Sequence, residues 1–242
     1  MLKILFSPSE AKNSGGEPDK SDIFYSNISR AEMLQAYDKI IKSDDMDQIS
    51  SLFGIKDPKK CQPYLQTLDH CKKMRAIQRY SGVAYQHLAY DDLPADAQEY
   101  LQKRVIIFSN LYGPILAKDK ICNYKVKQGV NIGTGIPDQF YKRYFSQALD
   151  QYLQESDILD LRAGYYDKFY KVSQPYTTLK FLKNGRVVSH FAKAYRGVVL
   201  KEIAKHKVSS IEDFIALPLD TLQIKQINKI KNKTEIVYDI LS

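Results

Sequence analysis

Leu2-Lys3-Ile4-Leu5-Phe6 opens the chain as a short apolar run, and Ser7-Pro8-Ser9-Glu10-Ala11-Lys12-Asn13-Ser14-Gly15-Gly16 follows it. Such a run, followed by a segment that contains Pro and Gly, is typical of a buried β-strand that ends in an irregular loop. It is shorter than the apolar core of a signal peptide, ~7–15 residues, so we interpret it as a first strand. The loop after such a strand often carries ligand-binding groups in α/β folds, which makes Lys12 a candidate.

Similar patterns recur along the whole chain. Strands are predicted at residues 105–108, 157–161, 177–183, 186–192 and 235–241, with Asn184-Gly185 as a hairpin turn between the third and fourth of these. Helices are predicted at residues 29–41 with Ser29 as N-cap, 45–53 ending at Gly54, 58–76, 93–103, 138–154, 194–206, 210–217 and 219–228. We therefore expect one α/β domain (mixed α+β) over residues 1–242, with a central mixed sheet flanked by helices.

Charge is unevenly distributed. The sequence carries 36 Lys and Arg against 28 Asp and Glu, a formal net charge of +8. Residues 1–161 contain 21 basic and 21 acidic side chains, whereas residues 162–242 contain 15 and 7. Eleven of the basic ones are interleaved with Tyr and Phe: Arg162, Lys168, Lys171, Lys180, Lys183, Arg186, Lys193, Arg196, Lys201, Lys205 and Lys207. The mixture suits a polyanion such as nucleic acid, and a solvated basic surface over an aromatic core is an equal alternative.

Cysteine usage and hydropathy restrict the cellular setting. Cys61, Cys71 and Cys122 are odd in number and form no Cys-x-x-Cys, so we expect reduced thiols in a cytoplasmic protein. No apolar stretch approaches the ~18–20 residues of a membrane helix, so no membrane association is expected. His70, Cys71 and Cys61 match no zinc spacing, and we predict neither a metal site nor a cofactor.

Three motifs partly resemble those of enzymes. Ser9-Glu10-Ala11-Lys12 has the Ser-x-x-Lys spacing of penicillin-recognising enzymes, but their partner motifs are absent. The glycines of residues 129–135 fit neither a phosphate-binding nor a dinucleotide-binding loop, so a plain loop is predicted. Asp160 and Asp167 flank Arg162, where they could act as acid and base, although orienting the arginine is the default interpretation.

Five segments together resemble the YaaA family of small bacterial proteins. They are Leu5–Lys12; Phe108–Gly113 with Asn123-Tyr124-Lys125 and Gly129; Asp160–Tyr166; His190–Gly197; and, more weakly, Tyr80–Tyr85. They occur in the family's order over nearly the whole chain. The sequence differs from the family's pattern where Asn110 replaces a Gly, Lys125 an Arg, and Leu116-Ala117 an Arg-Pro pair.

The resemblance implies a peroxide-stress protein with a positively charged cleft that binds DNA through a helix-hairpin-helix-like element and helps limit damage from intracellular iron. The candidate anion-binding residues are Lys12, Tyr124, Lys125, Arg162, His190, Lys193 and Arg196. The candidate hairpin is Asn110, Leu111, Tyr112 and Gly113. DNA, bound without sequence specificity, is the expected partner, and no enzymatic activity is expected in this interpretation. The alternative is an enzyme that acts on an anionic small molecule or nucleotide in the same cleft.

Overall fold

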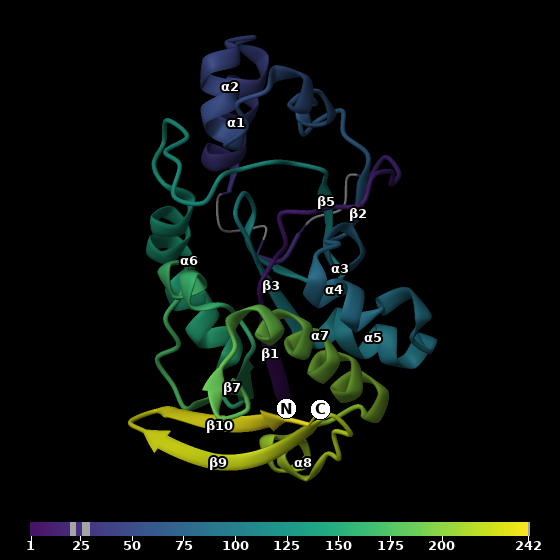
Figure 1. Ribbon diagram of the computed structural model, residues 1–242. Coiled ribbons are helices and arrows are strands. Elements are labelled where there is room, and N and C mark those ends of the chain that lie inside the picture. Colours follow the sequence, from purple (N-terminus) through teal and green to yellow (C-terminus); the bar gives the residue numbers. More distant parts are fainter. Residues whose placement is uncertain (20–22, 26–29, 242) are drawn as a thin grey trace.

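A computed structural model describes residues 1–19, 23–25 and 30–241, without the side chains of Ser189 and His190 (Figure 1). The expected N-cap Ser29 lies outside the described residues. The strands are β1 (Leu2–Phe6), β2 (Lys73–Arg75), β3 (Val105–Ser109), β4 (Gly113–Leu116), β5 (Lys120–Cys122), β6 (Asp157–Asp160), β7 (Tyr176–Lys183), β8 (Arg186–Val187), β9 (Leu222–Ile230) and β10 (Lys233–Ile240).

Helices and short 3₁₀ turns connect these strands. The α-helices are α1 (Ala31–Lys42), α2 (Met46–Phe53), α3 (Ala76–Arg79), α4 (Val83–Leu88), α5 (Ala95–Arg104), α6 (Pro137–Leu153), α7 (Ser189–His206) and α8 (Ile211–Ala216). The 3₁₀ turns are η1 (Pro58–Lys60), η2 (Gln62–Tyr64), η3 (Tyr90–Asp92) and η4 (Gly164–Lys168). As expected, α2 ends at Gly54, which takes the left-handed conformation that favours glycine.

A mixed, mostly parallel sheet of eight strands forms the centre of the described structure. Its order is β4-β3-β1-β6-β7-β10-β9, with β8 paired to β7. Strand β1 runs parallel to both β3 and β6, and all five residues of β3 are buried. Helix α6 lies on one side of the strands and α4, α5 and α7 on the other (Figure 1). These helices bury both faces of the sheet, which explains the apolar runs of β1 and β3 and confirms the predicted α/β class.

The helix predicted at residues 58–76 is wrong. The segment instead forms η1 and η2, a turn, and strand β2. Pro63 lies inside it, and a proline removes a helical hydrogen bond and clashes with the preceding turn. Its last residues are then free to pair with β5, as Lys73 does with Cys122.

Two assignments near the C-terminal end also change. Residues 222–228, predicted within the helix 219–228, belong instead to edge strand β9, because pairing with β10 overrides an ambiguous apolar spacing. The predicted strand 186–192 is only two residues long, and α7 begins at Ser189. The Asn184-Gly185 hairpin itself is confirmed, since Lys183 pairs with Arg186 across it.

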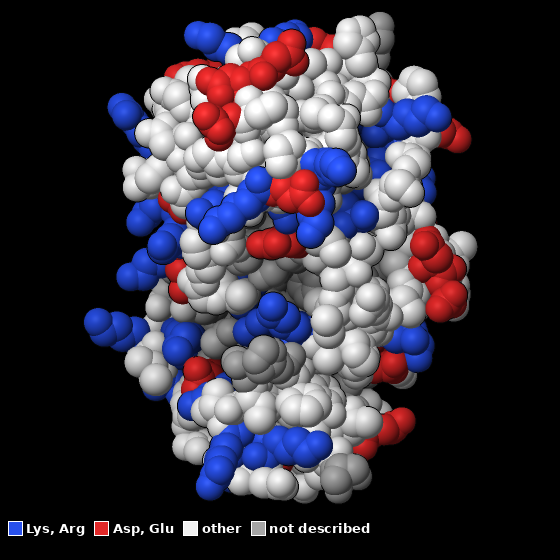
Figure 2. Space-filling view, turned by 45° about the horizontal axis from the view of Figure 1, so that its top comes forward, with Lys and Arg blue, Asp and Glu red and all other residues white. Residues whose placement is uncertain are grey.

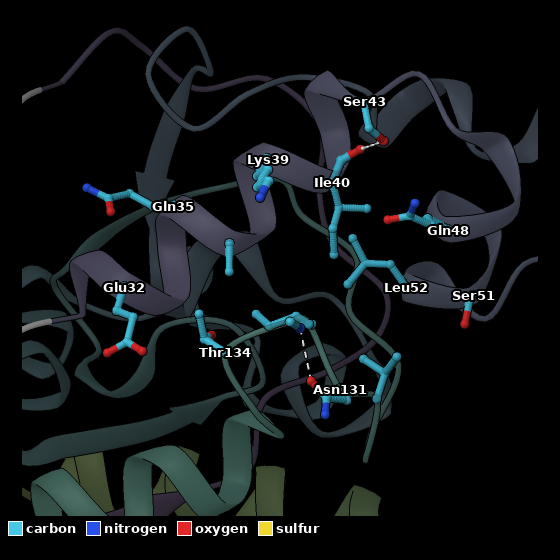
Figure 3. A pocket seen from close by; sticks show the side chains of 14 residues that line it. Glu32, Gln35, Lys39, Ile40, Ser43, Gln48, Ser51, Leu52, Asn131 and Thr134 are labelled. Carbon is cyan, nitrogen blue, oxygen red and sulfur yellow. Dashed lines mark hydrogen bonds between the residues drawn. The ribbon is translucent and has the colours of Figure 1, made fainter.

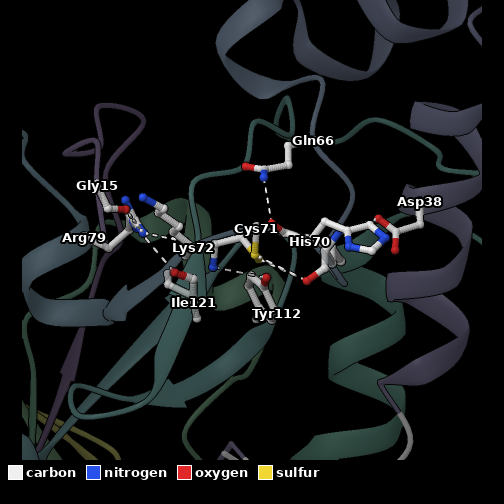
Figure 4. The surroundings of a disulfide bond; sticks show 11 residues. Gly15, Asp38, Gln66, His70, Cys71, Lys72, Arg79, Tyr112 and Ile121 are labelled. Carbon is white, nitrogen blue, oxygen red and sulfur yellow. Dashed lines mark hydrogen bonds between the residues drawn. A yellow bond between two sulfur atoms is a disulfide. The ribbon is translucent and has the colours of Figure 1, made fainter. Parts of the chain in front are cut away.

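The expectation of three reduced thiols is also wrong. Cys71 and Cys122 form a disulfide with a Cα–Cα distance of 5.7 Å, and Cys61 is free and buried. The β2–β5 pairing brings together two cysteines that are 51 residues apart in the sequence. Beside the disulfide, the fully buried Arg79 donates hydrogen bonds to the carbonyl oxygens of Gly15, Lys72 and Ile121 (Figure 4).

Helices α4 and α7 pack against each other at Gly197. A Cβ atom on Gly197 would lie 2.0 Å from the backbone oxygen of Ala84, an atom that cannot rotate away. We expect Gly197→Ala to lower the free energy of unfolding by about 2–3 kcal/mol in urea denaturation, because overpacking forces the helices apart. The matched control is Gly164→Ala, whose Cβ would meet nothing within 4 Å. Equal stabilities of the two variants would contradict this packing.

No helix of the described residues is long and apolar enough to cross a membrane.

Candidate anion-binding site

A pocket of about 550 Å³ lies outside the carboxyl ends of β1 and β6. The chain leaves β1 toward β3 on one side and later returns to place β6 on the other side of β1. Open α/β sheets bind ligands where the strand order reverses in this way. The pocket wall is formed by Phe6 at the end of β1, residues 7–11 of the loop that follows it, and residues 82–85 at the start of α4. After β6, the lining residues are Leu161, Ala163, Tyr165 and Tyr166, and Gln128, Lys193 and Arg196 also contribute.

Arg196 is a half-buried cation in this wall, on α7. Burial lowers the pKa of its guanidinium, and the more distant Asp160 opposes that shift. Within the described part of the chain, the guanidinium of Arg196 forms neither a hydrogen bond nor an ion pair. A guanidinium that is partly removed from water without a partner is costly, and a bound anion would offset that cost.

Lys12 lies next to the same pocket. Its Nζ donates to the backbone oxygens of Ser9 and Glu10 at 3.3 Å each, and both of these residues line the pocket. The Nζ atom also lies 4.2 Å from the centre of the Tyr124 ring. Burial, with smaller effects from neighbouring charges, lowers the pKa of Lys12 to about 7. No carboxylate of residues 1–19, 23–25 or 30–241 forms an ion pair with it.

Lys125 and Lys193 complete the set of nearby lysines. The half-buried Lys125 pairs with Glu10, with 3.2 Å between Nζ and Oε2. Lys193 is exposed on α7 and lines the pocket. Figure 2 shows a hollow near the middle of one face, with basic side chains above and below it and acidic ones among those above. Glu10 lines the pocket, and its pairing with Lys125 places an acidic and a basic side chain together beside it.

Tyr124 is buried in a chain of hydroxyl groups. Its hydroxyl lies 2.7 Å from Ser109 Oγ and 2.9 Å from the Tyr80 hydroxyl. Ser109 Oγ already accepts the N–H groups of Leu111 and Tyr112, so its own hydrogen is donated to Tyr124. These hydrogen bonds fix the Tyr124 ring beneath the Lys12 amine, and the buried ring is not exposed to a ligand.

Arg162 is not available to a ligand, which corrects its place among the candidate residues. It is 5% exposed, and its Nε and Nη2 atoms donate to the two oxygens of Asp160 at 2.9 and 2.7 Å. Its Nη1 donates to the backbone oxygens of Tyr166 and Tyr170. The interpretation that the carboxylate orients the arginine is confirmed, and Arg162 fixes the loop that follows β6.

The segment Asn110–Gly113 is a buried turn between two strands. Ser109 at the end of β3 pairs with Gly113 at the start of β4, and Leu111 is fully buried. Gly113 has φ = 69°, and a Cβ there would lie 2.3 Å from the Tyr141 ring, which excludes other residues. The expected helix-hairpin-helix-like element is therefore wrong for Asn110, Leu111, Tyr112 and Gly113.

The basic segment of residues 162–207 does not line a single cleft. Lys193 and Arg196 line the pocket, Arg162 is interior, and Lys207 pairs with Asp96 on α5. His190 belongs to α7 by its backbone rather than to a strand, and its side chain lies outside the described residues. Recognising the helical spacing from residue 189 onward could have shown that the basic residues of this segment point in different directions.

Several pocket residues were not predicted as site residues. Tyr85 donates to the Ser7 backbone oxygen at 2.8 Å, Tyr165 donates to Asp138 at 2.9 Å, and Gln128 donates to the Tyr166 hydroxyl at 3.1 Å. Tyr85 lies in the weak fifth motif and the Tyr165-Tyr166 pair in the third, so the motifs contained a signal. No motif indicated Gln128, because its position at the pocket depends on the conformation of the loop after β5.

A second cavity of about 660 Å³ lies between α1, α2 and residues 130–134 (Figure 3). Ile40 and Leu52 face one another in it, whereas Gln35 and Ser51 point away. Lys39 is its one basic lining residue, so it lacks the concentration of cations found at the β1–β6 edge. Among the described residues, no group of three or more His, Cys, Asp or Glu could hold a metal ion.

Comparisons with known proteins agree with the ordered motifs. A family model described as peroxide stress protein YaaA matches residues 2–227. The chain belongs to this family. An uncharacterized protein of Campylobacter jejuni is 40% identical to this YaaA-family chain over 245 residues, covering 99% of this chain and 100% of that protein. A UPF0246 protein of Fusobacterium nucleatum is 25% identical and covers 93% of this chain and 94% of its own length.

The motifs of this YaaA-family member come together at the pocket. The loop after β1, the residues after β6 and the α7 segment with Lys193 and Arg196 all line it. Tyr124 and Ser109, from the second motif, meet under Lys12. Segments that are distant in the sequence are thus joined at one edge of the sheet.

Proposed function

We propose that this peroxide stress protein binds DNA, with backbone phosphate held by Arg196 and Lys193 at the pocket and one nucleotide unit entering it. The observation that carries the proposal is the half-buried guanidinium of Arg196 with no acceptor in the described structure. Phosphate supplies such an acceptor, in a geometry that a guanidinium matches with two parallel hydrogen bonds. The role in limiting iron damage, which the resemblance implies, stays part of this proposal.

The size and lining of the pocket support a nucleotide unit. A volume of about 550 Å³ lies within the range of small-ligand sites and is too small for a duplex. Of its three lining tyrosines, Tyr85 and Tyr166 are almost fully buried, whereas the half-buried Tyr165 can present an aromatic face, and such faces stack on bases without sequence preference. A DNA strand would therefore lie across the opening, with its phosphates at α7.

Affinity for DNA should fall steeply with salt, because each neutralised phosphate releases counterions. We expect Arg196→Ala and Lys193→Ala each to weaken the binding of a labelled single-stranded oligonucleotide about 3- to 10-fold and to reduce the salt slope by about 1. Fluorescence anisotropy at several salt concentrations measures both quantities.

The matched control is Lys225→Gln, which removes one positive charge from edge strand β9, where Lys225 pairs with Asp239. This variant should keep both the affinity and the salt slope. Equal losses in all three variants would show that net charge, and not the pocket, drives binding. Absence of binding at low salt would overturn the proposal.

The pocket also favours a second candidate, an enzyme for an anionic small molecule or nucleotide. A pocket too narrow for a duplex is what such an enzyme requires, and Lys12 and Arg196 lie at it with no carboxylate partner in the described part of the chain. A nucleoside monophosphate should then compete with the oligonucleotide, and Arg196→Ala should weaken both ligands equally. Binding of the nucleotide without any binding of DNA would select this candidate.

A further inference from the structure

Lys12 differs from an ordinary phosphate-binding lysine in its surroundings. Its amine is held by two backbone carbonyl oxygens rather than by a carboxylate, and the residues that carry these oxygens, Ser9 and Glu10, line the same pocket as Arg196 and Lys193. We propose that Lys12 is a nucleophile that forms a Schiff base with an aldehyde carried beside a phosphate group in this pocket. The inference builds on the proposed function only in taking phosphate as the bound anion.

The charges around Lys12 favour a neutral amine, the form that has a free electron pair. Burial is the largest influence, and the nearby Lys125 and Arg79 act in the same direction, whereas Glu10 opposes them. Together they lower the pKa of Lys12 to about 7, so about half of the amine is neutral at that pH. A lysine that is desolvated or next to another cation is the usual form of an amine nucleophile.

The aromatic rings beside the Lys12 amine can stabilise the imine as well as the ammonium group. The Tyr124 ring centre lies 4.2 Å from Lys12 Nζ and the Tyr80 ring centre 5.3 Å from it. Burial raises the pKa of both phenols, so they stay neutral and present an aromatic face. A positively charged imine would keep the cation–π contact that the ammonium group makes.

The chemical step is a condensation that releases water. The Lys12 nitrogen attacks the carbonyl carbon, and one proton passes from nitrogen to oxygen to give a carbinolamine. The hydroxyl group then takes a proton from solvent and leaves as water, and the nitrogen electron pair forms the C=N⁺ bond. Neither an oxidant nor a metal ion is needed, because no atom changes its oxidation state overall.

Two sources can supply an aldehyde next to phosphate. One is the ring-opened deoxyribose of an abasic site in DNA, which has phosphates on both sides. The other is a free aldehyde sugar phosphate. Both carry a phosphate for Arg196 and Lys193, which line the pocket, and an aldehyde for Lys12, whose Nζ lies 3.3 Å from the backbone oxygens of the lining residues Ser9 and Glu10.

Trapping with cyanoborohydride tests the proposal, because hydride reduces the imine to a stable secondary amine. The probes are an abasic single-stranded oligonucleotide, the same strand in a duplex, and glyceraldehyde 3-phosphate. We expect a covalent adduct that peptide mass spectrometry assigns to Lys12. Lys12→Gln and Lys12→Arg should each lower adduct formation about 100-fold, since an ordinary lysine is almost wholly protonated at pH 7.

The matched control is Lys103→Gln, a change to an exposed lysine on α5 that pairs with Glu99. It should leave the adduct yield unchanged. In the unaltered protein, the trapping rate should rise with a midpoint near pH 7, whereas adducts at surface lysines would rise toward pH 10. This profile does not depend on any variant being folded.

The outcomes separate this inference from the proposed function. Binding is measured in parallel with an oligonucleotide that carries tetrahydrofuran, an abasic analogue without an aldehyde. If that oligonucleotide does not bind but glyceraldehyde 3-phosphate gives the Lys12 adduct, DNA binding fails and the Schiff base stands. If it binds and no probe gives an adduct at Lys12, the nucleophile is overturned and DNA binding stands.

Discussion

Replacing Arg162 by Met is expected to lower the free energy of unfolding by about 3–5 kcal/mol, because it leaves the buried carboxylate of Asp160 without its counter-ion. The Arg162 side chain is almost fully buried and lies 4.4 Å above the Phe108 ring centre. It also donates to two backbone oxygens of residues 166–170, so its removal frees the loop that lines the pocket. Urea denaturation followed by circular dichroism measures the loss.

The control is Arg143→Met on α6, which removes an exposed arginine and should change stability by less than about 0.5 kcal/mol. Adding Asp160→Asn to Arg162→Met should recover part of the loss, because the orphaned charge is then removed. If Arg162→Met is as stable as the Arg143 variant, then Arg162 does not hold this loop.

Removing the Cys71–Cys122 disulfide should lower the free energy of unfolding by a similar amount, about 4 kcal/mol. The bond closes a loop between cysteines 51 residues apart, and a cross-link of that span restricts the unfolded chain strongly. The Cys71→Ala/Cys122→Ala variant and the native protein treated with a dithiol reductant should both show this loss in urea denaturation.

The same reductant provides the control. Applied to the double alanine variant, it should change nothing, because Cys61 has no partner cysteine in the described structure. A native protein that is equally stable with and without reductant would contradict a stabilising disulfide. Since β5 leads directly to Tyr124 and Lys125, reduction of the disulfide should also make the Tyr124 ring beside Lys12 more mobile.

Most of the sheet could be predicted from short apolar runs. The runs at residues 2–6, 105–108 and 157–161 are buried in the three adjacent parallel strands β1, β3 and β6. The errors at residues 58–76 and 219–228 share one cause. In both, local apolar spacing is compatible with a helix, and strand pairing decides the conformation instead: β2 pairs with the distant β5, and β9 pairs with β10, the next strand along the chain.

Prediction of the candidate site was less complete, because side-chain exposure is not written in the sequence. Arg162 and Arg196 look alike as basic residues near aromatic ones, yet Arg162 is paired and buried and Arg196 lines the pocket unpaired in the described structure. The turn at residues 110–113 kept its place in the motif order but lies between strands and not helices. Only neighbours from distant segments distinguish these cases.

Leu2–Phe6 and the loop to Lys12 illustrate which features follow from local sequence and which follow from tertiary structure. Local sequence alone indicates an apolar strand that ends in an irregular loop with Lys12, because apolar runs and the positions of Pro and Gly are local properties. The tertiary structure places β6 beside β1, so that Arg196 lines the same pocket as that loop, and no local pattern indicates this. It also decided the state of Lys12, because the desolvation and charges that lower its pKa come from residues up to about 110 positions away.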